Sequence, residues 1–333
     1  MALQIPDQQE MRLGCEWRVG GLDLEGQGYC GIRTKECTIV FVYCRRGLSL
    51  VEILVVIAIL AILLSLLLPA IQSARESARR VDCGNRLRQM SLGLLQYHNA
   101  KQVFPPAIDS QSRLMWSGYL LPYIEQGNLY GKIDRNLAWN QGTNAQVCAT
   151  FLKIFRCPSS TAPDTMTAQG IENRVPCDYL VCASGTDTRE SGPGVLAGRP
   201  DSDGVYYIDS RTRIAAIRDG TSNTVAMGDS FFQFEELDLD HTGFPQFLDR
   251  WCVGTLEGTG NEVSEAMGST GVALNSHLLE VFIDERELAF GSQHPGGAQM
   301  ALVDGAVRFY SADMDRVVWG ALGTRGSGEI PSE

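Results

Sequence analysis

Residues 45–71 read RRGLSLVEILVVIAILAILLSLLLPAI, and this stretch decides the architecture. Glu52 is its one charged residue between Leu48 and Ile71. As a helix, residues 48–70 would extend about 35 Å, which exceeds the hydrocarbon thickness of a bilayer, about 30 Å. So long a run without polar groups is atypical of a buried core helix. The stretch therefore predicts a transmembrane helix.

The position of Glu52 separates three kinds of N-terminal segment: a secretory signal, a plain membrane anchor and a processed leader. A secretory signal has a shorter apolar region and ends in a small-x-small cleavage site, which Ala70-Ile71-Gln72 does not provide. A plain anchor has no reason to carry a carboxylate, which costs about 2.5 kcal/mol or more at the centre of a membrane helix. Glu52 therefore indicates a specific role, unless it lies shallow enough to stay solvated.

The octapeptide Arg45–Glu52 resembles the class III signal of type IV pilins and type II secretion pseudopilins. The resemblance implies that a prepilin peptidase/methyltransferase cleaves after Gly47 and methylates Leu48, where the family usually has Phe. It also implies that Glu52 pairs with the N-terminal amine of a neighbouring subunit during assembly. Pro69, at the twenty-second mature position, is expected to kink the helix.

The net charge of −11 belongs to the C-terminal part of the chain. Residues 1–47 are neutral and residues 48–100 carry +2, which leaves −13 for residues 101–333. Nucleic-acid binding needs clustered cations that displace phosphate counterions, and residues 101–333 have no Lys/Arg cluster. This composition excludes nucleic acid as a partner.

Ten cysteines divide into four before the apolar stretch and six after it. The six have no CxxC pair, and the chain has only four histidines, so disulfides in an oxidising compartment are favoured over zinc. Buried free thiols are the alternative. The connectivity stays open among the candidate disulfide cysteines, Cys83, Cys148, Cys157, Cys177, Cys182 and Cys252.

The pattern downstream predicts an α+β fold. Apolar residues recur at steps of three and four to about Asn99, which predicts one helix over 49–99 whose second half packs against the head. The residues of this apolar face are Ile71, Ala74, Ala78, Val81, Leu87, Met90, Leu94 and Tyr97. A short helix is expected at Trp116–Tyr130. Later apolar runs predict strands at 204–209, 224–228, 298–303 and 306–311, the last two joined by a type I′ turn at Asp304-Gly305. The expected organisation is a leader (1–47, with initiation near Val42 as an alternative), a transmembrane half-helix (48–70), an amphipathic half-helix (71–100), a head (101–325) and a tail (326–333).

The C-terminal region carries a second resemblance. His294 stands ten residues before Asp304-Gly305, after Phe155-Arg156-Cys157-Pro158 and the segment 217–224, IRDGTSNT. This order of motifs is similar to prepilin-like proteins, numerous in planctomycete-type bacteria, that end in a His, nine residues, Asp-Gly signature and have a head of unknown function. The resemblance implies a pilin-like fold in which a long N-terminal helix packs on a β-rich head.

Residues suited to chemistry have structural explanations in this sequence. His294, Asp304 and Gly305 are interpreted as a structural motif in which His294 and Asp304 bond each other or backbone groups. Asp201 and Asp203 are a weak calcium candidate, because the rest of an EF-hand loop is missing. No G-x-S-x-G, H-E-x-x-H or nucleotide-binding motif is present, so we expect neither enzymatic activity nor a cofactor nor a bound metal.

The function expected from these features is structural. The chain is predicted to be a pilin-like or pseudopilin-like filament subunit in the cytoplasmic membrane, with its head on the periplasmic or extracellular side and other pilin-like subunits as partners. The alternative is a surface binding protein that uses a prepilin signal and never polymerises. By the positive-inside rule, the five arginines that follow the apolar stretch would favour a head inside the cytoplasm. The predicted orientation, with the head outside, therefore depends on the processing signal and the cysteines.

Overall fold

The computed structural model describes residues 49–189, 202–237, 246–248, 250–256, 263–276 and 283–328. Gly47, Leu48 and the rest of the predicted leader lie outside the described residues. The chain divides into two compact units, Met1–Leu66 and Leu67–Glu333, and each is described by itself.

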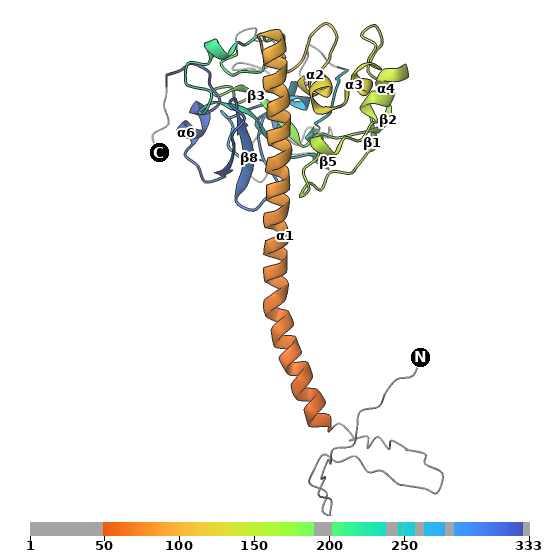
Figure 1. Cartoon of the computed structure of the whole chain (residues 1–333), viewed down its shortest axis with the longest axis vertical. Coiled ribbons are helices and arrows are strands. Elements are labelled where there is room, and N and C mark those ends of the chain that lie inside the picture. The colour runs from red at the N-terminus through yellow and green to blue at the C-terminus, as the bar shows by residue number, and fades with distance from the viewer. Residues whose placement is uncertain are drawn as a thin grey trace, which may run out of the picture. The chain divides into compact units, whose positions relative to one another are not determined.

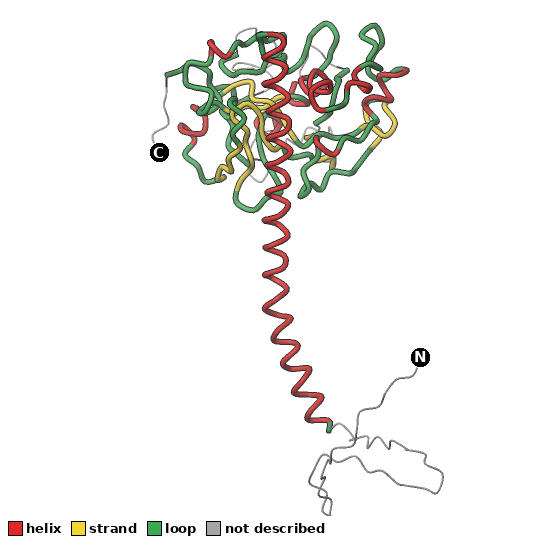
Figure 2. Tube along the Cα trace, in the orientation of Figure 1, coloured by secondary structure: helices red, strands yellow, loops and turns green. Residues whose placement is uncertain are grey.

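Helix α1 spans Leu50–Lys101, as predicted, and continues through Pro69 (Figure 2). In the first unit, every described side chain from Ser49 to Leu66 is exposed. Among the described residues, α1 is the one helix long and apolar enough to cross a membrane. Such complete exposure of a leucine- and isoleucine-rich surface suits a lipid environment and not water.

In the second unit, α1 becomes a packed helix from Cys83 onward. Its buried residues recur with helical spacing and form one face: Cys83, Arg86, Leu87, Met90, Ser91, Gly93, Leu94 and His98. Leu87, Met90 and Leu94 are therefore buried as predicted. The earlier part of the predicted face is exposed, at Ile71, Ala74, Ala78 and Val81.

Residues 71–81 were predicted to pack on the head through their apolar face, and this prediction is wrong because that face is exposed. There the helix meets the head through long polar side chains: the Arg80 guanidinium lies 4.0 Å from the ring centroid of Phe309, and Gln299 donates to the Arg80 carbonyl. An apolar stripe shows which face could be buried, but whether anything covers it depends on where the sheet ends.

The head is built around a five-stranded sheet ordered β7-β3-β4-β8-β9. β3 pairs in parallel with β7, and the other pairs are antiparallel. Figure 1 shows α1 passing in front of strands β3 and β8. The strands are β3 (Tyr179–Ser184), β4 (Val225–Asp229), β7 (Met267–Ser269), β8 (Gly297–Leu302) and β9 (Val307–Ser311).

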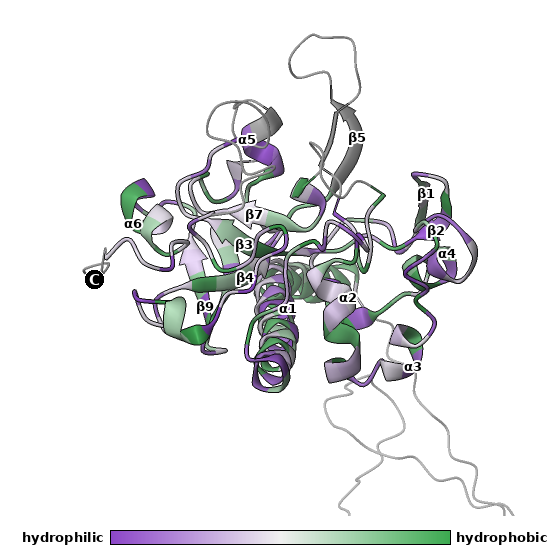
Figure 3. Cartoon of the chain, turned by 90° about the horizontal axis from the view of Figure 1, so that it is seen from above, coloured by the Kyte–Doolittle hydropathy of each residue, from purple (hydrophilic) through white to green (hydrophobic). Residues whose placement is uncertain are grey.

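Both faces of this sheet are buried, as alternation along β3 shows. Tyr179 and Val181 belong to the core cluster shared with α1, whereas Leu180 and Cys182 belong to a second cluster around Trp319. Successive side chains in a strand point to opposite faces, so one strand serves both clusters. In Figure 3, viewed from above, α1 and α6 lie on either side of β3 and β4.

The remaining elements are short and surround this sheet. They are α2 (Trp116–Leu120), η1 (Leu121–Ile124), α3 (Gly127–Tyr130), α4 (Gly142–Cys148), η2 (Lys153–Phe155), β1 (Met166–Ala168), β2 (Ile171–Arg174), η3 (Ile214–Ala216), β5 (Gln233–Leu237), β6 (Gln246–Leu248), η4 (Val263–Glu265), α5 (Ile283–Glu287) and α6 (Arg316–Ala321).

Two predicted elements were wrong. The helix expected at Trp116–Tyr130 is three short pieces, because Pro122 cannot donate a helical hydrogen bond and Glu125 adopts a left-handed conformation (φ 64°). Residues 204–209 form no strand. Gly204 and Tyr206 only donate to carbonyls of β3.

The hairpin of β8 and β9 is confirmed, but its turn is not type I′. Gly305 has a positive φ (87°) and Asp304 does not, whereas type I′ needs positive φ at both central residues. Gly305 N–H donates to Leu302 O instead. The turn is a type I turn closed by glycine in a bulge position, and Asp304 Oδ1 stabilises it by accepting from Ala306 N–H (2.9 Å).

Candidate functional site

The start of α1 is organised by two residues of the predicted processing signal. Ser49 N–H donates to Glu52 Oε2 (2.8 Å), and Val51 N–H donates to Ser49 Oγ (3.2 Å). This reciprocal arrangement is a capping box, which satisfies N–H groups that a helix start leaves unpaired. Glu52 therefore has a local partner within its own chain. The spacing Ser-x-x-Glu is the signal that our sequence analysis missed.

The C-terminal motif separates into two unrelated structural features. His294 precedes β8 and Asp304 follows it, so a six-residue strand, roughly 20 Å long, lies between them. The Asp304 carboxylate accepts from the backbone N–H of Ala306 in its own turn, as one of our two interpretations expected. The other interpretation, a bond between His294 and Asp304, is wrong because His294 bonds Glu76 and Cys157 instead.

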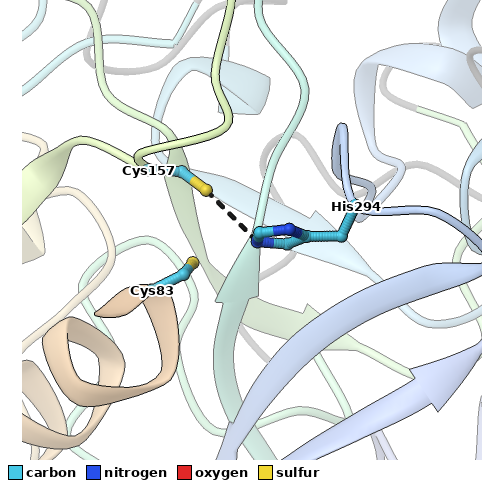
Figure 4. Close-up of side chains that lie close together, drawn as sticks. All are labelled: Cys83, Cys157 and His294. Carbon is cyan, nitrogen blue, oxygen red and sulfur yellow. Dashed lines mark hydrogen bonds between the residues drawn. The ribbon is translucent and has the colours of Figure 1, made fainter. Parts of the chain in front are cut away.

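His294 belongs to a buried cluster that we call the cysteine–histidine cluster: Cys83, Cys157 and His294, with Glu76 and Asp229 beside them. Cys157 Sγ lies 3.4 Å from His294 Nε2, and the dashed line in Figure 4 marks this contact. Cys83 Sγ lies 2.9 Å from Asp229 Oδ1, and the two sulfurs and the imidazole nitrogen all lie within 4.8 Å of one another. The cluster thus gathers two thiols and an imidazole from three distant parts of the chain.

The residues of this cluster come from elements that hold them firmly. Cys83 and Glu76 stand two turns apart on the same face of α1. Cys157 follows η2, and its N–H donates to Asp178 Oδ2 (2.7 Å), a carboxylate that also pairs with Arg156. His294 lies in the turn before β8, where its N–H donates to Ser292 Oγ (3.0 Å).

Glu76 orients the imidazole. Its Oε1 lies 2.5 Å from His294 Nδ1, and its Oε2 accepts from Arg79 Nε (2.8 Å) and Ser159 Oγ (3.1 Å). The Nδ1 contact leaves Nε2 facing the thiols. Glu76 is therefore the residue that sets which imidazole nitrogen is available to Cys157.

The electrostatics of the cluster favour a thiolate at Cys157. The hydrogen bond with Cys83 lowers the pKa of Cys157 to about 5, with His294 adding to this against the effect of burial. Burial lowers the pKa of His294, but the bonds to Cys157 and Glu76 outweigh it and raise that pKa to about 9. The same bond to Cys157, together with burial, raises the pKa of the Cys83 thiol. Burial raises the pKa of Asp229 to about 8.

Among the other predicted disulfide cysteines, the structure brings one further pair together. Cys177 and Cys252 contact each other through their side chains, next to a bridge between Pro176 and Trp251. Cys148 and Cys182 are buried separately. All six are free thiols in this structure, so the predicted disulfides stay a prediction.

The remaining predicted motifs have structural roles. The Asp203 carboxylate accepts from Gly185 N–H (3.0 Å) and the Thr186 hydroxyl (2.5 Å), so each of its oxygens has a hydrogen-bond partner in the segment after β3. Asp201 lies outside the described residues. Asp219 accepts from Ser327 N–H and Gly328 N–H, so the described part of the predicted tail is bound to the head.

Two family profiles match the chain. One, a prokaryotic N-terminal methylation motif, covers residues 43–68, and the other, a protein of unknown function (DUF1559), covers residues 72–316. The chain belongs to the DUF1559 family. No curated protein and no solved structure matches it. The first match includes Gly47, Leu48 and Glu52, and the second includes the whole cysteine–histidine cluster.

The methylation motif and the exposed apolar part of α1 together make this DUF1559 protein pilin-like. They support attachment to a membrane and processing by a prepilin peptidase. Glu76 and Asp229 belong to none of the motifs described above, and His294 and the cysteines were interpreted separately. The seven-residue spacing of Glu76 and Cys83, which puts both on one helix face, was an available signal.

Proposed function

We propose that this protein is a structural, non-enzymatic subunit of a type IV pilus-like or type II secretion-like filament, held by α1. The observation that carries the proposal is the first part of α1. A processing signal stands directly before a helix whose side chains from Ser49 to Leu66 are all exposed. Copies of such a helix can pack together in a filament after leaving the lipid, and pilin-like subunits are thus the partners that this surface suits.

Glu52 has two roles in this proposal that a single substitution would confuse. It caps its own helix, and its charge is available to a neighbouring Leu48 amine once Gly47 has been removed. Glu52→Gln separates the roles, because glutamine completes a capping box but carries no charge. Glu52→Ala removes both.

Cross-linking in intact cells tests the filament. Single cysteines introduced along residues 53–66 of the otherwise natural chain are expected to yield ladders, that is, series of cross-linked oligomers. Glu52→Gln is expected to abolish the ladders although the helix cap persists. Ladders that survive Glu52→Gln would remove the charge from the mechanism. Absence of ladders at every position, in a chain whose N-terminus is methyl-Leu48 by mass spectrometry, would contradict polymerisation itself.

The proposed orientation places the head outside the cytoplasm, against the arginines that follow the apolar stretch. Several of these arginines are engaged by the head: Arg80 stacks on Phe309, and Arg86 donates to the Lys153 carbonyl (3.0 Å). Arginines held in a folded domain differ from the loop charges that the positive-inside rule counts. A reporter at the C-terminus that is active only outside the cytoplasm tests this orientation.

In an oxidising compartment we propose a disulfide between Cys177 and Cys252. Each thiol loses one proton and one electron to a disulfide-bearing oxidoreductase, which is itself reduced to a dithiol. The contact between the two side chains supports this pairing. A non-reduced digest should contain the two peptides joined and 2 Da lighter than the free thiol pair. Recovery of both thiols alkylated from freshly isolated membranes would contradict it.

A cleft favours the second candidate function, a surface binding protein that does not polymerise. Its volume is about 560 Å³, and it lies beside the C-terminal end of α1. Its lining combines aromatic and cationic side chains, including Tyr97, Phe104, Tyr119, Lys101, Arg211 and Arg213. Two carboxylates also line it: Asp109 accepts from the Tyr119 hydroxyl, and Asp209 accepts from the Ser110 hydroxyl. This lining suits a ligand with a flat face and an anionic group, such as an acidic sugar.

Ligand binding discriminates this second candidate from the filament. Acidic oligosaccharides are expected to raise the melting temperature of the natural chain and not that of Arg211→Ala, with Arg218→Ala as a control outside the cleft. A melting temperature unchanged by acidic and neutral glycans alike would leave the cleft without this function.

A further inference from the structure

We propose that Cys83, Cys157 and His294 bind a divalent transition metal ion, with Zn²⁺ the best suited, and that Asp229 supplies the fourth ligand. Two thiolates, one imidazole and a carboxylate form a donor set that zinc accepts in tetrahedral geometry. The inference concerns the head and does not depend on whether the protein polymerises.

The spacing of the donor atoms fits one ion. Zinc bonds of about 2.3 Å to sulfur and about 2.0 Å to nitrogen place the ligand atoms of a tetrahedral site about 3.5–3.8 Å apart. Cys157 Sγ and His294 Nε2 are 3.4 Å apart, and the three donor atoms lie within 4.8 Å of one another. Asp229 Oδ1 lies 2.9 Å from Cys83 Sγ and is the oxygen through which a carboxylate contacts that thiol. To serve as the fourth ligand, the Asp229 side chain would have to move towards the three donor atoms.

The surroundings of His294 match those of a metal ligand. Histidines that bind metals usually donate their second ring N–H to a carboxylate, which fixes the tautomer and the orientation of the ring. Glu76 Oε1 takes this position, 2.5 Å from Nδ1, and is itself held by Arg79 and Ser159. Nε2 is thereby directed towards the sulfur atoms (Figure 4).

The charge balance also calls for a cation. The side chain of His294 is fully buried, as are Cys83 and Asp229. Two thiolates cannot both ionise in such a site without a compensating charge. A divalent ion removes this conflict: any proton held by the two thiols, by His294 Nε2 or by the Asp229 carboxyl leaves to solvent on binding, and the ion then compensates the charges of the thiolates and the carboxylate.

The ion would join three segments that are distant in sequence. Cys83 belongs to α1, Cys157 to the loop after η2 and His294 to the turn before β8. A structural zinc site contributes to folding free energy because the unfolded chain does not preform it. Its consequence here is that metal binding fastens the packed part of α1 to the sheet.

A disulfide between Cys83 and Cys157 is the competing outcome, because both thiols lie in the same cluster. It would use the two sulfur atoms and leave the orientation of His294 by Glu76 without a purpose. The two outcomes differ in mass, in thiol reactivity and in metal content. One preparation can therefore decide between them.

The test uses the full chain purified in detergent, with Zn²⁺ and Co²⁺ alone as probes. About one zinc per chain is expected by mass spectrometry of the metal. After removal of zinc, Co²⁺ should restore binding with the absorption of a tetrahedral cobalt–thiolate centre. Cys83→Ser and His294→Gln should abolish this absorption, and Glu76→Gln should weaken affinity about 10–100-fold. Cys182→Ser, at a buried cysteine outside the cluster, is the matched control and should bind normally.

Two results would overturn the proposal. One is a joined Cys83–Cys157 peptide in a non-reduced digest of freshly purified chain, which would establish the disulfide. The other is a chain with both thiols reduced that binds neither ion. If Cys83→Ser fails to fold, competition for zinc between the natural chain and a chromogenic chelator, compared with Glu76→Gln and Cys182→Ser, still decides the question.

Discussion

The two parts of α1 differ in composition and in environment. From Leu50 to Leu66 every side chain is exposed, whereas between Cys83 and His98 one face is buried under the sheet. The first part is apolar around its whole circumference and the second only on one side. A helix that is apolar on all sides needs a solvent that is apolar, while one with a single apolar face needs a partner surface. One continuous helix thus has a first part suited to lipid and a second part that packs on the sheet.

The largest expected effect comes from removing core volume in the packed part. Leu87 is fully buried, so Leu87→Ala is expected to reduce the free energy of unfolding of the head by about 2–5 kcal/mol. Leu60→Ala, the same change in the exposed part, should leave it unchanged. Urea unfolding followed by the fluorescence of the buried tryptophans measures both. Equal losses in the two variants would show that the parts of α1 do not differ as described.

A charge introduced into the exposed part of α1 should affect membrane insertion and not the stability of the head. Leu60→Arg is expected to cost about 2.5–3.5 kcal/mol for insertion of the helix into a membrane and nothing for the head. Val81→Arg, at a position 64% exposed in the second part, should change neither. Fractionation of cell membranes, with head stability measured in parallel, checks the pair. Retention of Leu60→Arg in the membrane fraction would argue against a spanning segment.

Two arginines sharpen the comparison within the packed part. Arg86 is buried, donates to the carbonyls of Lys153 and Arg156 and pairs with Asp82, whereas Arg88 is exposed. Arg86→Ala should cost about 1.5–3 kcal/mol, the range for hydrogen bonds to charged groups, while Arg88→Ala should stay within about 0.5 kcal/mol. Thermal unfolding of the two variants measures this difference. A cost for Arg88 equal to that for Arg86 would contradict the described packing.

The smallest effect is expected at the start of the helix. Ser49→Ala removes the hydroxyl that accepts from Val51 and should cost the helix about 0.5–2 kcal/mol, whereas Ser49→Asp should preserve the cap. Hydrogen exchange of the first-turn amides in micelles reports this change, since head unfolding should not respond. Unaltered exchange in Ser49→Ala would mean that the cap does not form in lipid.

The candidate site was predicted only in pieces. The signal at Gly47, Leu48 and Glu52 could be predicted, because recognition by a peptidase and insertion into a membrane both depend on consecutive residues. The hairpin at Asp304-Gly305 is local too, although its turn type depends on the bulge at Gly305. Of the two interpretations for His294 and Asp304, bonds to backbone groups are found at Asp304, whereas a bond between the two side chains is not, because strand β8 separates them. The actual partner of His294, Glu76, lies 218 residues away.

The sequence by itself determined the membrane segment, the processing signal, the α+β class and the extent of α1. Each of these depends on composition or periodicity over a short stretch, where neighbouring residues share one environment. Only the tertiary structure decided that α1 is covered from Cys83 onward and that Cys83, Cys157 and His294 meet. Those features depend on how a five-stranded sheet brings together segments distant in the chain, and no local pattern of residues encodes that meeting.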